Sequence, residues 1–200
     1  MFFTRRPSPA AIERFLRASQ EARLSYAPIG ILGDGGSSNL DEAIVTIGNG
    51  YTDFERAKAA LMAWKQFNVG WVETFPHHAP IAVGTVVAVL MRHFGFWSLN
   101  GCRVVYNVGS HRDARFGFAY GTLTNHAESG EELFEVILNR DNDEVKYRIR
   151  ATSRPQAALA RLGQPIVRAL QARFRRDSSA AMRRAITRFD SQRSADAYER

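Results

Sequence analysis

The sequence contains little that could be cross-linked or inserted into a membrane. Its single cysteine, Cys102, excludes an internal disulfide and lies in an apolar run, which predicts a buried, unreactive thiol. The longest uncharged apolar run, Ile81–Met91, is too short to span a bilayer. Residues 1–7 place their charges after an apolar pair with no hydrophobic region behind them, so no secretory signal is expected. These features predict a soluble, cytoplasmic protein.

Several chemical signatures are also missing. The glycine-rich stretch Gly33–Ser38 lacks the Gly-Lys-Ser/Thr of a phosphate-binding loop, and no Gly-x-Ser-x-Gly nucleophile motif occurs. The adjacent residues His77 and His78 cannot present both rings from one regular face, and His93 and His111 belong to no ligand motif. We therefore predict no metal site and no cofactor.

The net charge of +7 is concentrated at one end of the chain. Residues 157–200 hold ten arginines against four acidic residues, so the remainder is nearly neutral. A solvated helix face is the simplest interpretation. The weaker alternative is binding of nucleic acid or an anionic membrane through Arg161, Arg168, Arg173, Arg175, Arg176, Arg183 and Arg184.

The chain length of 200 residues and the hydrophobic content of 45% suit one domain with a real core. We predict a single domain over residues 1–190, with an N-terminal helix at 8–22, a core at 24–185 and a flexible tail at 191–200. The oligomeric state is left open.

Seven segments have the residue types and turn boundaries of strands. In the last of them, Val145, Tyr147 and Ile149 alternate with charged residues, as expected for an antiparallel sheet with one buried face. The short connections exclude helical crossovers between the last six strands. The predicted strands are Ala43–Ile47, Gly70–Phe75, Thr85–His93, Cys102–Val108, Arg115–Leu123, Glu132–Leu138 and Glu144–Ala151.

Helical periodicity appears in three places. Ser8 and Pro9 start the N-terminal helix, and a second helix buries Phe54, Ala57, Leu61 and Trp64 after the first strand. A long amphipathic helix then follows Pro155, with a kink or restart at Gly163–Pro165; its apolar positions are Leu159, Leu162, Ile166, Leu170 and Phe174. Near Asp177–Ser179 we expect the helix to stop and a separate short helix to carry Met182, Ile186 and Phe189.

This order of elements predicts an α+β fold in which a seven-stranded curved antiparallel sheet wraps around a long C-terminal helix. It resembles the helix-grip architecture of START and Bet v 1 type proteins, in which a cavity lies between the sheet and that helix. The chain differs from that pattern in its one helix after the first strand, where two are usual, and in its extra N-terminal helix.

At the residue level the chain resembles an uncharacterised family, domain of unknown function 1990. The resemblance runs from about Leu24 to about Ala185 and departs from the family at Ala127, where a proline is usual. It rests on the phrases Leu24–Gly30, Cys102–Tyr106, Gly117–Leu123, His126, Ser129–Glu132 and Ser153–Pro155.

Chemical groups are densest at the end of the strand that contains Tyr120. Phe116, Phe118, Tyr120 and Thr122 share one face of this strand, and Gly117, Ala119 and Gly121 share the other. A buried Tyr120 hydroxyl needs a partner. The turn that follows supplies His126, Glu128, Glu131 and Glu132.

We predict that His126, oriented by Glu131 or Glu132, acts as a general base or as a polar anchor for a ligand that reaches Tyr120. The alternative is structural: the carboxylates accept backbone N–H bonds and pair with Arg103, Arg115 or Arg154.

The leading functional hypothesis is therefore the binding of an apolar or amphipathic small molecule between sheet and helix. The alternative is an acid–base enzyme, a cyclase, isomerase or hydrolase, that uses Tyr120, His126 and Glu131 as catalytic residues. The predicted ligand-binding residues are Tyr26, Trp64, Tyr106, Phe118, Tyr120, Thr122, Tyr147 and Arg150.

Overall fold

The computed structural model describes residues 1–32, 40–109, 113–155 and 164–198. The glycine-rich stretch, His111, Leu159, Arg161 and Leu162 lie outside these residues. In chain order the elements are β1 (Phe2–Phe3), α1 (Pro9–Gln20), β2 (Asp41–Asn49), α2 (Gly50–Met62), the short helix η1 (Lys65–Phe67), β3 (Val72–Phe75), β4 (Val86–His93), β5 (Phe96–Gly109), β6 (Arg115–Thr122), β7 (Glu128–Leu138), β8 (Glu144–Pro155) and α4 (Gln164–Tyr198).

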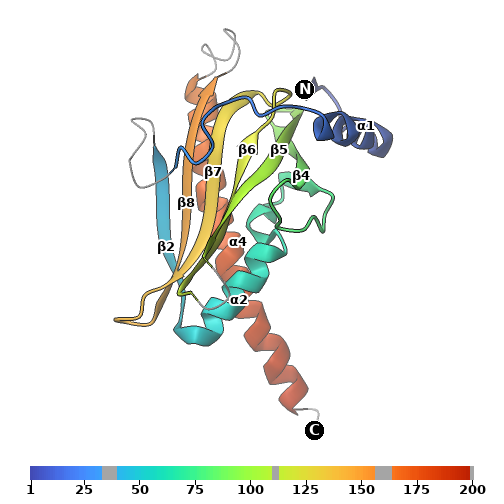
Figure 1. Cartoon of the computed structure of the whole chain (residues 1–200). Helices are drawn as coiled ribbons and strands as arrows, with labels where there is room; N and C mark the ends of the chain where they lie inside the picture. Colours follow the sequence, from blue (N-terminus) through green and yellow to red (C-terminus); the bar gives the residue numbers. More distant parts are fainter. Residues whose placement is uncertain (33–39, 110–112, 156–163, 199–200) are drawn as a thin grey trace.

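One antiparallel sheet contains all the strands. Its order is β2-β8-β7-β6-β5-β4-β3, and the two-residue β1 pairs with β5 (Figure 1). The seven predicted strands are confirmed in order, with two corrected starts. β5 begins at Phe96, because Phe94 and Gly95 form a tight turn with φ of 49° and 79°. β7 begins at Glu128, so Glu131 and Glu132 lie within a strand and not in the turn.

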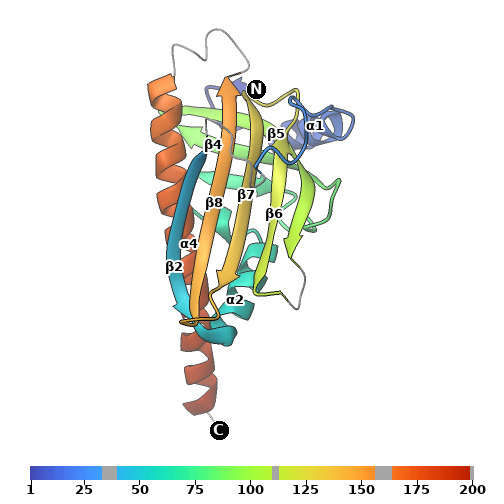
Figure 2. The same ribbon diagram turned by 60° about the vertical axis from the view of Figure 1, so that its left-hand side comes forward.

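The inner face of the sheet, defined here as the face that contacts α2 and α4, carries the main core. Phe118, Phe134 and Tyr147 from the sheet pack there with Phe54 and Leu61 of α2. Figure 2 shows α4 running along this face and continuing beyond the lower end of the strands. The α+β helix-grip architecture expected from the order of elements is thereby confirmed.

The outer face of the sheet is covered by the N-terminal part of the chain. Ser8 caps α1 by accepting a hydrogen bond from the Ala11 amide, and Pro9 occupies its first turn. Ile12 and Phe15 of this helix pack on Leu90 and its neighbours in β4 and β5. The extra N-terminal helix is therefore attached by its own small apolar cluster.

The C-terminal helix differs from the prediction. α4 is continuous over 35 residues from Gln164 to Tyr198, with no stop near Asp177–Ser179. The residue between Phe174 and Met182 in the buried row is Ser178, which is fully buried and bonds to the Tyr147 hydroxyl at 2.9 Å. The buried face of α4 therefore continues every fourth residue through a serine, whereas the pattern of apolar residues alone predicts an interruption at this position.

Candidate functional site

A cavity of about 200 Å³ lies between the inner face and the first half of α4. Its apolar wall is formed by residues of β1, η1, β3, β4 and α4; these are Phe2, Phe67, Val72, Val89, Met91, Val167, Leu170 and Phe174. Polar residues from β4 to β8, from α4 and from the turn between β6 and β7 line the rest. The cavity is therefore apolar on one side and polar on the other.

The carboxyl of Glu132 is one of the buried polar groups at the cavity. Its Oε2 accepts a hydrogen bond of 2.6 Å from the hydroxyl of Tyr120, its direct cross-strand partner. Burial raises the pKa of Glu132 from 4.5 to about 7 and also raises the pKa of Tyr120. Glu132 Oε1 has no hydrogen-bond partner among the residues that the structure describes. This pair supplies the partner that the sequence requires for the buried Tyr120 hydroxyl.

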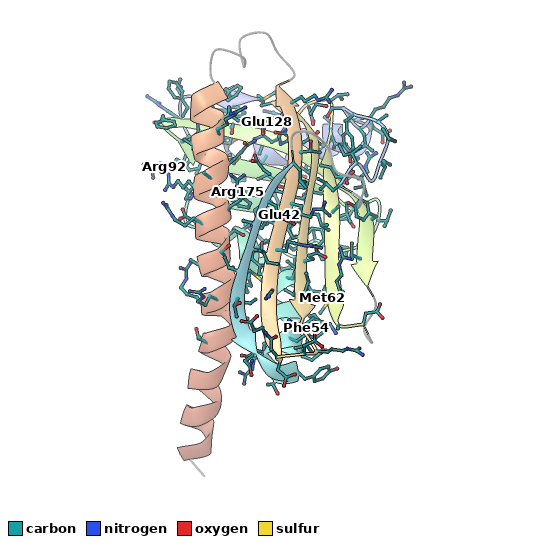
Figure 3. The ribbon with its side chains drawn as sticks, turned by 90° about the vertical axis from the view of Figure 1, so that its left-hand side faces the viewer. Glu42, Phe54, Met62, Arg92, Glu128 and Arg175 are labelled. Atoms are coloured by element: carbon teal, nitrogen blue, oxygen red, sulfur yellow. The ribbon has the colours of Figure 1, made fainter. Side chains whose placement is uncertain are left out.

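A second carboxylate, that of Glu128, lies nearer the end of the sheet. It accepts hydrogen bonds from Gln171 Nε2 at 3.2 and 3.3 Å and from Ser153 Oγ at 3.3 Å. Burial raises its pKa. Figure 3 shows Glu128 at the upper end of the sheet and Arg175 lower down beside α4. Arg175 reaches Asp41 of β2, with 3.4 Å between Nη1 and Oδ2.

His126 lies in the turn between β6 and β7 and also lines the cavity. Its Nδ1 lies 2.9 Å from the Glu128 amide nitrogen and 3.0 Å from the Glu128 carbonyl oxygen, so it accepts from the amide in one tautomer and donates to the carbonyl in the other. Burial lowers the pKa of the ring from 6.5 to about 4, so the imidazole is neutral at pH 7.

The structure does not bring Glu131 to His126. Glu131 borders the cavity, but its carboxylate lies on the outer face. It accepts hydrogen bonds from the hydroxyls of Tyr26 at 2.7 Å and Tyr106 at 2.8 Å, and from the Gly30 amide at 3.0 Å. Tyr26, Tyr106 and Glu131 therefore form a cluster that ties the N-terminal segment to the sheet, on the side away from the cavity.

Four other predicted ligand-binding residues also lie away from the cavity wall. Phe118 is in the solid part of the inner core, Trp64 donates to the Ala79 carbonyl at 2.8 Å, and Tyr147 bonds to α4. Arg150 lies opposite Leu133 on the outer face, 3.6 Å from the Glu42 carboxylate. The remaining predicted site residues, Tyr120, Thr122 and His126, do line the cavity.

The arginine pairing in the structural alternative differs in detail from the prediction. Arg103 donates to the carbonyls of Gln20 and Ala22, and Arg115 pairs with the buried Glu135. The three carboxylates at the start of β7 are held by tyrosine hydroxyls, Ser153, Gln171 and, for Glu131, also the backbone amide of Gly30. Part of the polar cluster is therefore structural, and part faces the cavity.

Strand parity could have separated these two parts. Glu132, Phe134 and Val136 alternate along β7, so Glu132 belongs to the face that carries the aromatic core. Gln171 and Phe174 of α4 could have been added from their spacing to Leu170. Phe67 gave no sequence signal, because it is positioned by the irregular chain between α2 and β3.

No other site of comparable chemistry appears among the described residues. Within them, no group of three or more His, Cys, Asp or Glu side chains is arranged to hold a metal ion. His77 and His78 are exposed in the connection that follows β3. No helix in the described ranges is long and apolar enough to cross a membrane.

The arginines of α4 have mixed environments. Arg173 and Arg176 pair with Asp177, at 3.3 and 3.0 Å, and Arg183 donates to the Thr46 carbonyl at 2.9 Å. Several of the residues behind the charge excess are thus engaged in contacts within the molecule. Other arginines of α4 are exposed, which agrees with the predicted solvated helix face.

Comparison with known proteins places the chain in a family and a fold. Residues 32–181 match the family model described as domain of unknown function (DUF1990). A UPF0548 protein of Dictyostelium discoideum is 32% identical over 93% of this chain and 96% of its own length. A UPF0548 protein of Deinococcus radiodurans is 36% identical over 92% and 98% of the two chains. The crystal structure of TTHA0849 from Thermus thermophilus aligns with a TM-score of 0.51 and 10% identity, over 74% of this chain and 97% of that one.

Proposed function

The chain belongs to the DUF1990 family, and we propose that it binds a small amphipathic molecule in the cavity between the sheet and α4. The observation that carries this proposal is the unpaired Glu132 Oε1 in a cavity whose opposite wall is apolar. The Glu132 carboxyl lines the cavity, so a ligand that displaces water from Oε1 has to supply a donor to offset the cost of desolvating this polar atom.

The cavity volume limits the size of the ligand. Pockets for drug-sized molecules typically measure about 300–1,000 Å³, and this cavity measures about 200 Å³. A single ring or a short chain fits that volume. A two-chain lipid exceeds it.

The test is native mass spectrometry of the protein purified from its own host, under conditions that retain noncovalent ligands. We expect a small bound mass that is lost from the Leu170→Trp variant, because the larger side chain fills the cavity. Ile44→Trp is the matched control, since Ile44 is 51% exposed on β2. Absence of any bound mass, together with no stabilisation of the protein by small amphipathic compounds, would contradict the proposal.

Acid–base catalysis on the same scaffold is a second candidate, favoured by the pKa of about 7 at Glu132. In this version Glu132 replaces the predicted Glu131 as the proton-transfer group, with Tyr120 bonded to it and His126 close to the cavity end. Turnover that is lost in Glu132→Gln and retained in Glu131→Gln would support it. If the protein binds a small molecule but converts no compound in extracts of its host, the catalytic candidate fails and only the binding proposal stands.

A further inference from the structure

We infer that the ligand is an organic cation: a small amine whose ammonium group lies against Glu132 and whose apolar part lies against the rings of Phe67 and Phe174. This inference rests on the proposed function and specifies its ligand class. It follows from the polar atoms, the charges and the ring faces that border the cavity.

The first step concerns hydrogen bonds at the polar wall. The Tyr120 hydroxyl is already used, because it donates to Glu132 Oε2. The amide nitrogen of Gln171 is also used, since it donates to Glu128 and to Ser153 Oγ at 3.1 Å. The open atom on Glu132 is a carboxyl oxygen. Among the described residues, Glu132 Oε1 therefore has no matching donor, and the ligand is expected to bring one.

The second step concerns charge. β7 contributes two carboxyl groups, Glu128 and Glu132, to the same face. α4 contributes Arg175, whose guanidinium is within 3.4 Å of Asp41 and is shared with that carboxylate. The other titratable groups at the cavity are the neutral His126 of the turn, His93 of β4, Tyr120 of β6 and Glu131 of β7, whose carboxylate is bonded on the outer face. Two carboxyl groups against one shared arginine favour a positively charged ligand.

The third step concerns the opposite wall. The rings of Phe67 and Phe174 are 5.3 Å apart, and Tyr120 stacks near Phe67 at 6.2 Å. Aromatic faces attract cations as well as apolar groups, by about 0.5–2 kcal/mol per contact. Leu170 and Val89 complete an apolar surface for the body of the ligand. A compact amine matches both walls at once.

An amine also has an advantage over its neutral and anionic analogues. An ammonium–carboxylate hydrogen bond is roughly twice as strong as a neutral one. A carboxylate ligand would face Glu132 as a like charge and would require it to be protonated. The raised pKa of Glu132 implies that binding of a cation near pH 7 releases part of a proton from this group.

The experiment compares benzylamine, benzyl alcohol and benzoate, which share a ring and differ in charge, by isothermal titration calorimetry with the full chain. We expect benzylamine to bind at least about tenfold more tightly than benzyl alcohol. Glu132→Gln should abolish this preference. Glu131→Gln, the neighbouring substitution on the outer face, should preserve it.

A second measurement avoids any dependence on the variants. Titrations of the unmodified protein with benzylamine at pH 7, in buffers of different ionisation enthalpy, should reveal proton release. The benzylamine affinity should also rise between about pH 6 and about pH 8 as Glu132 ionises.

The two levels of the proposal fail differently. Equal affinity for the three compounds, or a preference for benzoate, would overturn the cation inference and leave small-molecule binding in place. Loss of the benzylamine preference in both glutamate variants would also overturn it, because the outer face should be irrelevant. No binding of any of the three by calorimetry, together with no bound mass in the native protein, would overturn the binding proposal itself.

Discussion

Two neighbouring residues, Glu131 and Glu132, carry their carboxyl groups to opposite faces of one strand. Glu131 is 2% exposed and is held by two tyrosine hydroxyls and an amide, so it anchors the N-terminal segment. Glu132 has one bonded and one open oxygen, so it is available to a ligand. A shift of one position along a strand thus separates a structural carboxylate from a candidate functional one.

At this scale we predict opposing pH effects from Glu132 and His126. Glu132 holds its proton up to about pH 7 in the folded state but only to 4.5 when unfolded. The folded state therefore binds more protons in that window, and the free energy of unfolding falls by about 3 kcal/mol as pH rises through it. His126, lowered from 6.5 to about 4, acts in the opposite direction. Its contribution raises the unfolding free energy from about pH 4 to 6.5.

Chemical denaturation at a series of pH values separates the two effects. Relative to the parent, Glu132→Gln should gain about 3 kcal/mol of unfolding free energy as pH rises from 4.5 to about 7. His126→Asn, which keeps a hydrogen-bond acceptor near Nδ1, should lose a similar amount from about pH 4 to 6.5. The raised pKa of Glu128 is common to all these proteins. Parallel curves for parent and variants would show that neither group is perturbed as described.

The tyrosine that bonds to Glu132 gives a second residue-scale prediction. Tyr120→Phe removes the donor at 2.6 Å and leaves Glu132 Oε2, like Oε1, without a hydrogen-bond partner among the described residues. We expect a loss of about 1–3 kcal/mol in the free energy of unfolding, measured by denaturant titration at pH 8, where Glu132 is ionised. Because a neutral Glu132 needs this donor less, the loss should shrink at pH 5. An equal loss at both pH values would indicate a packing effect instead.

The sequence predicts the cluster at the β6–β7 corner but not its division between the two faces. Tyr120, His126 and the glutamates were identifiable as polar groups close in space, since they flank one hairpin. The predicted strand starts at Glu132, whereas β7 starts at Glu128. Once β7 starts at Glu128, alternation assigns Glu132 to the Phe134 face and Glu131 to the opposite one. The strand boundary therefore decides which of the two glutamates faces the cavity.

Among the elements, α4 shows how a polar residue can belong to the buried face of a helix, here called the seam between α4 and β8. Ser178 continues the row from Phe174 to Met182, and its hydroxyl bonds to Tyr147 of β8. Hydrophobic periodicity treats such a serine as an interruption, which is why the helix was expected to stop there. The partner that makes the serine compatible with the core comes from a distant strand, so local sequence carries no sign of it.

This seam predicts a measurable coupling between α4 and β8. Ser178→Ala should lower the free energy of unfolding by about 1–3 kcal/mol, because it leaves the buried Tyr147 hydroxyl unpaired. Adding Tyr147→Phe to that variant should cost less than Tyr147→Phe costs in the parent. Urea denaturation of the four proteins gives the coupling energy. Strict additivity would mean that the two hydroxyls do not stabilise each other.

For the whole molecule, the sheet and α4 join the cavity to the main core. Leu170 and Phe174 border the cavity, while Met182 and Ile186 of the same helix pack between sheet and α2 further along. The order of strands and the long helix were predictable, because short antiparallel connections admit few topologies. The cavity's lining was not, since it depends on side chains from η1, β3 and β4 that meet only in the folded chain.

At this scale we predict that ligand binding protects distant amides. Saturation of the protein with a cavity ligand should slow hydrogen exchange along α4 as far as Met182 and Ile186, and not only at Leu170 and Phe174. Amides of α1 that exchange by local opening should be unchanged, because that helix is attached to the other face. Protection confined to the cavity end would show that the two halves of α4 open independently.

The continuity of α4 has a consequence for how a guest enters. A rod of 35 residues, about 50 Å long, has no hinge at Ser178 that would let its first half swing aside while the second stays seated. Entry of a ligand from the side would require the whole of α4 to move away from the sheet. We therefore expect the ligand to enter where Phe2 and His93 line the cavity, because small shifts of short segments suffice there.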